Sequence, residues 1–161
     1  MAMTPAEIRE ALAANKMRVR PKSESWLMRT IGFLLALFRI NARFLERYTT
    51  VIWRDVWYPS SWGDFDIDDD AQLAAHASTF EHELVHVAQR KKWWLFWAVS
   101  YLLLPLPFGL AWFRWRWERE AYLTNIRNGR TIEQCVDALW AYGWPWPRAW
   151  MRAWFEAHAD K

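Results

Sequence analysis

The sequence contains little cysteine and has a small net charge, and each of these features excludes a class of protein. A single cysteine, Cys135, excludes an internal disulfide framework and a cysteine-rich zinc cluster. A formal net charge of +3 falls well short of the basic stripe of a nucleic-acid-binding protein, so we expect no nucleic-acid partner. No signal-peptide pattern is recognisable, because the first residues have the pattern of a capped helix, with Thr4, Pro5 and Glu7 at the capping positions. We therefore expect a protein that is cytoplasmic or peripheral to the inner face of a membrane.

Tryptophan, by contrast, is abundant, with fifteen residues in a chain of 161. Trp rings favour places where one edge is apolar and the other is wet. Two interpretations follow: the aromatic core of a small helical protein, or a belt at a membrane surface. The length fits a single domain, 1–161. We divide it into an N-terminal helix and connector (1–25), a core (26–128) and C-terminal helices (129–161).

Hydrophobic periodicity predicts a mainly α (α+β) fold in which a small, short-stranded β element precedes one of the helices. The residues "RVRPKSES" are expected to form a polar connector, and the apolar run "IGFLLALF" a helix in the core. The acidic run "DFDIDDD" lacks the glycine and glutamate of an EF-hand, so we interpret it as a helix N-terminus. The predicted helices cover 26–47, 69–92, the two arms of a hairpin broken at 105–109, 131–142 and 147–159, and one or two strands lie within 49–58. Asn128-Gly129 is a helix C-terminal signal and is expected to end the second arm of the hairpin.

The pentapeptide "HELVH" has the spacing of a metal site. His82 and His86 lie four residues apart, so on a helix both imidazoles share one face and can reach one ion. Glu83 projects to the side, where it can take a proton from the attacking water. This pattern favours a catalytic zinc ion, which usually has three protein ligands and one open position.

The third ligand must come from elsewhere in the chain. A metzincin would carry histidine at the position of Lys92 and glycine at that of Gln89, so that arrangement is excluded. Downstream, "EREAY" contains the pattern E-x-x-A, beginning at Glu118. HExxH followed by this pattern resembles the gluzincin metallopeptidases, and the order of elements over 26–128 is similar to that of a minimal gluzincin-like (zincin-like) domain.

The resemblance implies a role for each matching residue. His82, His86 and Glu118 would hold Zn²⁺, and Glu83 would be the general base. Glu118 and Glu120 point about 200° apart on one helix, so both cannot be ligands, and we choose Glu118 on the family pattern. Where membrane-type members carry aspartate, this chain has Tyr122, which we expect either to help stabilise the oxyanion or to be structural.

The segment 93–113 contains no charged residue and, as one helix, would span about 31 Å, the thickness of a bilayer's hydrocarbon core. A metal ion bound by both His86 and Glu118 requires the chain to turn back, and "PLPFG" (105–109) offers the bend. The resulting hairpin either packs into a core or makes a monotopic contact with one leaflet.

The sequence therefore predicts a zinc-dependent metallopeptidase acting on a peptide or protein substrate. A peptide would lie extended along an edge strand within 49–58. Two alternatives stay open: hydrolysis of a non-peptide amide, and a non-catalytic protein that is stabilised by zinc or binds a membrane or partner through a Trp-rich face. The sequence does not specify the oligomeric state.

Overall fold

The computed structural model describes residues 2–37, 42–103, 112–140 and 147–159. It is mainly helical with one small sheet, which confirms the predicted mainly α (α+β) class. The chain divides into two compact units, Met3–Glu83 and Leu84–Lys161 with Met1–Ala2, and the boundary falls inside one long helix. Each unit is described by itself below, and the expected single domain stays a prediction.

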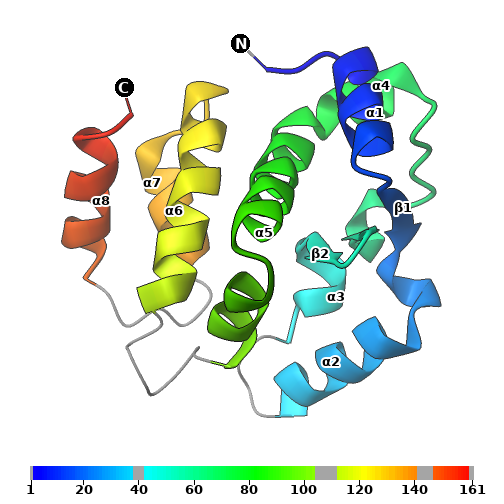
Figure 1. Cartoon of the computed structure of the whole chain (residues 1–161), viewed down its shortest axis with the longest axis horizontal. Coiled ribbons are helices and arrows are strands. Elements are labelled where there is room, and N and C mark those ends of the chain that lie inside the picture. Colours follow the sequence, from blue (N-terminus) through cyan, green and yellow to red (C-terminus); the bar gives the residue numbers. More distant parts are fainter. Residues whose placement is uncertain (1, 38–41, 104–111, 141–146, 160–161) are drawn as a thin grey trace. The chain divides into compact units, whose positions relative to one another are not determined.

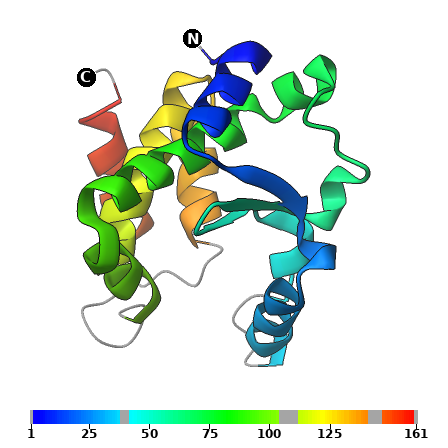
Figure 2. The ribbon, with the colours of Figure 1, turned by 45° about the vertical axis from the view of Figure 1, so that its right-hand side comes forward.

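The first unit combines short helices with the sheet. Figures 1 and 2 show its first helix, α1, and its second, α2, at opposite ends of this unit with the sheet between them. Its elements are α1 (Pro5–Ala14), β1 (Arg18–Pro21), η1 (Lys22–Glu24), α2 (Trp26–Leu37), α3 (Phe44–Arg47), β2 (Thr50–Ile52), β3 (Asp55–Tyr58), η2 (Ser60–Trp62), α4 (Asp70–Ala75) and the start of α5 (Ala77–Leu103).

The sheet has the order β1-β3-β2. β3 pairs antiparallel with β2, and Val51 lies opposite Val56. β1 pairs parallel with β3, and Val19 also lies opposite Val56. The prediction that "RVRPKSES" is a connector was therefore wrong, since its first four residues form a strand. Within the predicted strand segment 49–58, β2 lies at an edge and β3 at the centre.

Two helices begin where their capping residues predict. Thr4 and Glu7 form the predicted capping box of α1. Asp69 accepts hydrogen bonds from the backbone N–H groups of residues 71 and 72, so the acidic run caps α4. The predicted helix 69–92 is in fact two helices, because α4 ends at Ala75, His76 caps it, and α5 begins at Ala77.

α2 also departs from its prediction. Its described part reaches Leu37, and residues 38–41 lie outside the described part. Arg43, just before the short helix α3, is not helical, so the predicted continuous helix 26–47 is wrong. Its apolar run is not a core helix either. α2 buries Met28 and Gly32, whereas Phe33, Leu34 and Leu37 are exposed.

The second unit contains the rest of α5 and the helices α6 (Trp112–Arg127), α7 (Ile132–Trp140) and α8 (Arg148–Glu156). Figure 1 shows α6, α7 and α8 side by side, and α7 contacts both of the other two. Gly129, with φ +94°, ends α6 as predicted, and the Arg130 N–H donates to the Asn125 carbonyl at 3.0 Å. The apolar core of this unit comprises Trp115, Tyr122, Cys135, Val136, Leu139, Met151 and Phe155.

α5 is kinked at Trp94, whose φ of 37° and ψ of −116° are not helical. The first arm of the predicted hairpin therefore continues α5 beyond the kink, and α6 provides the second arm. The predicted bend at 105–109 lies outside the described residues. None of the described helices is both long and apolar enough to cross a membrane.

Candidate metal centre

Three predicted ligands come together in the structure. α5 carries His82 and His86 one turn apart, and α6 carries Glu118. One ligand atom from each lies within 4.8 Å of the other two. The His86 Nε2 and Glu118 Oε2 atoms are 3.6 Å apart. Two ligands of a tetrahedral zinc ion with bonds of about 2.0 Å lie about 3.3 Å apart, so small side-chain movements would suffice to coordinate it.

The group is largely withdrawn from water. His86 and Glu118 are each 5% exposed, and His82 is half-buried. A buried carboxylate is costly unless a cation or hydrogen-bond donors compensate its charge. Arg114, one turn earlier on α6, places its Nε 4.0 Å from Glu118 Oε1. A metal ion between the imidazoles and this carboxylate would compensate the charge more directly.

Gln89 fixes the orientation of His86. The Nδ1 atom of His86 lies 3.0 Å from Gln89 Oε1, and an amide oxygen can only accept, so Nδ1 is the protonated nitrogen. Nε2 is then the unprotonated nitrogen of the neutral ring, and it lies 3.6 Å from Glu118 Oε2. Metal-binding histidines commonly donate their second nitrogen in this way.

Gln89 is in turn held by α6. Its amide nitrogen donates to the Trp117 carbonyl at 3.0 Å and to Glu120 Oε2 at 2.8 Å. The two glutamates of α6 therefore have different neighbours. Glu118 lies with the imidazoles, and Glu120 accepts from the side chain that orients one of them.

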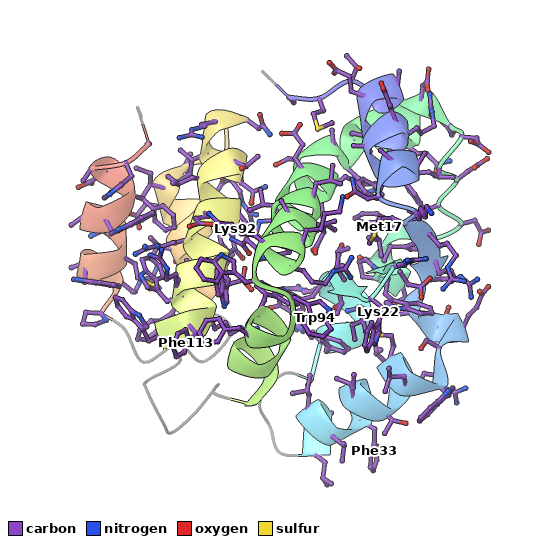
Figure 3. The ribbon with its side chains drawn as sticks, viewed as in Figure 1. Met17, Lys22, Phe33, Lys92, Trp94 and Phe113 are labelled. Carbon is purple, nitrogen blue, oxygen red and sulfur yellow. The ribbon has the colours of Figure 1, made fainter. Side chains whose placement is uncertain are left out.

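A buried lysine accompanies the predicted general base. Glu83 is buried next to His82 in α5, and Lys22, in η1 of the same unit, is 1% exposed. Burial lowers the pKa of Lys22 to about 7, while the charge of Glu83 acts in the opposite direction. The Lys22 Nζ donates to the Phe44 carbonyl at 3.0 Å and lies 3.6 Å from the centre of its ring. Figure 3 shows Lys22 directed toward the interior of its unit.

Sequence reasoning missed the roles of Gln89 and Lys22. The role of Gln89 could have been noticed, because this residue lies three positions after His86 and therefore on the same face of the helix. The role of Lys22 had no sequence signal, since Lys22 sits in a polar stretch that resembles a connector.

Tyr122 lies one turn after Glu118 on α6. Its side chain is 5% exposed and belongs to the apolar cluster formed by α6, α7 and α8. This placement gives the tyrosine a packing role, and its predicted contribution to an oxyanion site stays a prediction.

No protein-family model matches this chain, and the comparisons with curated proteins and with solved structures found no match either. The resemblance to gluzincins therefore depends on the two short motifs and stays a prediction. The independent observation is geometric: His82, His86 and Glu118 lie close together, and all three side chains can bind a metal ion.

Proposed function

We propose that this protein is a zinc-dependent metallopeptidase in which His82, His86 and Glu118 hold the ion and Glu83 is the general base. The observation that carries the proposal is the convergence of the three ligand atoms within 4.8 Å, with a buried glutamate directly beside one of them. Two imidazoles and one carboxylate form a ligand set used by catalytic zinc.

The donor set fits zinc in number as well as in kind. Among the residues that the structure describes, the group has three members, and three protein ligands leave one position open for water or substrate. When bound, zinc would act as a Lewis acid and bring the pKa of a coordinated water down to about 7.

The chain's own residues would then handle the proton. Glu83 would accept a proton from the attacking water and later return it to the amine of the leaving product. Gln89 would keep the proton of His86 on Nδ1, so that Nε2 stays available as a ligand.

The sheet restricts where an extended peptide could pair. β3 is hydrogen-bonded on both sides, so within 49–58 it is β2 that has an edge to offer. A peptide added to β2 would gain register from main-chain hydrogen bonds. This mode of binding is a refinement of the proposal, and the peptidase assignment does not depend on it.

The proposal is tested by separating zinc binding from turnover. We expect the purified protein to bind one equivalent of zinc, measured by elemental analysis, and to cleave members of a fluorogenic peptide library. Glu83→Gln should retain zinc and lower kcat by about 10²–10⁴-fold, because proton transfer is lost. His86→Ala should lose zinc and activity together.

Glu10→Gln is the matched control, since Glu10 is an exposed glutamate of α1. It should leave both zinc content and kcat unchanged. Full turnover by Glu83→Gln, or a wild-type protein that binds no zinc at neutral pH, would overturn the proposal.

The second candidate is a zinc ion that only stabilises the fold, which the burial of His86 and Glu118 favours. In that case every variant that keeps zinc would keep its thermal stability, and the wild-type protein would cleave neither peptides nor other amides. Turnover of non-peptide amides alone would retain the catalytic site and change only the substrate class.

A further inference from the structure

α2 has an exposed apolar face in addition to its buried one. Met28 and Gly32 are buried, and a Cβ at Gly32 would lie 2.8 Å from Leu45 Cγ, so this side of α2 packs closely on α3. At about 100° per residue, the exposed apolar residues cover an arc of about 120° on the opposite side. They are Trp26, Leu27, Phe33, Leu34 and Leu37, which are 75%, 38%, 65%, 44% and 60% exposed.

Figure 3 shows Phe33 projecting from α2 on the side away from α3 and the sheet. Both faces of the helix are thus apolar, and among the described residues the face with Met28 and Gly32 is the buried one. An apolar stripe of this width is what a helix normally buries. Solvent exposure of so much aromatic and aliphatic surface marks an interaction site.

The charge around this face is strongly positive. Residues 16–58, from β1 to β3, contain nine lysines and arginines against two glutamates and Asp55, a formal net charge of +6, and one of these cations, Lys22, is buried. Arg29 lies on α2 beside the apolar arc, and Arg43 and Arg47 lie at α3. Arg18 and Arg20, in β1, are ion-paired with Asp55. All five are exposed. The complementary surface is therefore apolar at its centre and anionic around it.

A lipid bilayer with anionic headgroups has this combination. Its acyl region accepts the Phe and Leu side chains, and its headgroup region attracts arginine. Trp26, at the first position of the helix, has the amphipathic ring that prefers the boundary. With twelve residues, α2 is about 18 Å long, which is too short to cross a core of about 30 Å. It would therefore lie in the plane of the membrane.

We propose that α2 binds the surface of an anionic membrane, with Phe33, Leu34 and Leu37 among the acyl chains. This contact is separate from the one predicted for 93–113, and it holds whether or not the protein is a peptidase. The metal ligands take no part in it.

Flotation of the full chain with lipid vesicles tests the proposal. Vesicles of phosphatidylcholine with about one-third phosphatidylglycerol should carry the protein upward, and about 0.5 M salt should release most of it by screening. The double variant Phe33→Glu, Leu37→Glu should lower the partition coefficient at least about 10-fold, since two buried apolar side chains are replaced by charges.

Ala36→Glu is the matched control. Ala36 is exposed on the same helix but lies about 120° from the centre of the apolar arc. Its substitution therefore adds one carboxylate, half the charge of the double variant, outside the proposed contact. Its partition coefficient should stay within about threefold of the wild type. Far-UV circular dichroism of all variants verifies that the helices are intact.

Three results would overturn the proposal. The wild-type protein could fail to float with anionic vesicles. The double variant could bind as well as Ala36→Glu, while Trp93→Glu, Phe96→Glu in α5 abolished binding, which would assign the contact to 93–113. Gel filtration could show a dimer that Phe33→Glu, Leu37→Glu dissociates, with no vesicle binding by the wild type, which would assign the face to a second copy.

Discussion

At the scale of single residues, the geometry of His86 depends on a side chain three positions along the same helix. Gln89 makes three hydrogen bonds through its amide: the oxygen accepts from His86, and the nitrogen donates to Trp117 and Glu120. A side chain held at three points cannot rotate without losing several hydrogen bonds. Gln89 therefore fixes both the tautomer and the ring orientation of one metal ligand.

Replacing Gln89 by alanine should weaken zinc binding without removing a ligand. We expect the dissociation constant to rise about 10–100-fold, the usual cost of losing such a supporting partner. Competition with a chromophoric chelator would measure it. A dissociation constant within twofold of the wild type would mean that His86 is oriented by its other neighbours.

The variant Glu120→Ala tests whether Glu120 affects zinc binding directly or through Gln89. If Glu120 acts through Gln89, the double variant Gln89→Ala, Glu120→Ala should bind zinc as weakly as Gln89→Ala alone. Additive losses would instead indicate that Glu120 interacts with the metal group by another route.

Lys22 should make stability depend on pH. Burial lowers its pKa to about 7 from 10.5, so between these values the unfolded chain binds more protons than the folded one. The contribution of Lys22 to the free energy of unfolding is then least favourable below pH 7 and rises as the pH approaches 10.5, by at most about 5 kcal/mol. Urea unfolding at pH 6.5 and 9.5 would measure this change.

Lys22→Met keeps the length of the side chain and removes the charge, so it should remove most of the rise. Lys91→Met, which changes an exposed lysine of α5, is the control and should keep it. Identical pH profiles for the wild type and Lys22→Met would contradict the proposed burial of the ammonium group.

Local sequence patterns were enough to predict the residues of the candidate site. His82 and His86 share a face because they are four residues apart, and a short motif selected Glu118 over Glu120. The partners of these residues could not be predicted, because Gln89 meets Glu120 across 31 positions and Lys22 influences Glu83 across 61. Such pairs depend on how the elements pack, which no local pattern encodes.

At the scale of secondary structure elements, the packing of α2 on α3 depends on the absence of a side chain at Gly32. Alanine normally stabilises a helix by about 1 kcal/mol relative to glycine. At Gly32, however, the added methyl group would lie 2.8 Å from Leu45 Cγ, and overpacking costs about 1–3 kcal/mol. We therefore expect Gly32→Ala to lower the free energy of unfolding by about 1 kcal/mol in urea titrations.

Shortening Leu45 provides the check. In a Leu45→Ala background the methyl group has space, so Gly32→Ala should become neutral or stabilising through helix propensity. A destabilisation of equal size in both backgrounds would show that the close approach of α2 and α3 is not its cause.

The elements that sequence identified correctly are those with strong local signals. Thr4, Pro5 and Glu7 define the start of α1, and Gly129 defines the end of α6. β1 was missed because its four residues include two arginines and a proline, and its parallel partner lies 37 positions further along the chain. The apolar run of α2 predicted a helix correctly, but apolarity alone does not distinguish a helix buried by protein from one exposed to another apolar phase.

At the scale of the whole molecule, zinc would join two helices that the chain connects only through a long intervening segment. His86 and Glu118 are 32 residues apart, and a common ion would fix both ends of that segment in the folded state. Because an ordered group of three ligands exists only in the folded chain, binding free energy becomes folding free energy.

Removal of zinc should therefore lower the melting temperature. With free zinc at about 100 times its dissociation constant, the folded state gains about 2.7 kcal/mol. For a chain of this length that corresponds to about 5–10 °C, measurable by calorimetry before and after chelation. Glu118→Gln should abolish the difference, and Glu120→Gln, the same change two positions along α6, should largely keep it. A melting temperature that chelation leaves unchanged in the wild type, or a Glu118→Gln variant that still responds fully, would mean that α5 and α6 are held together without the ion.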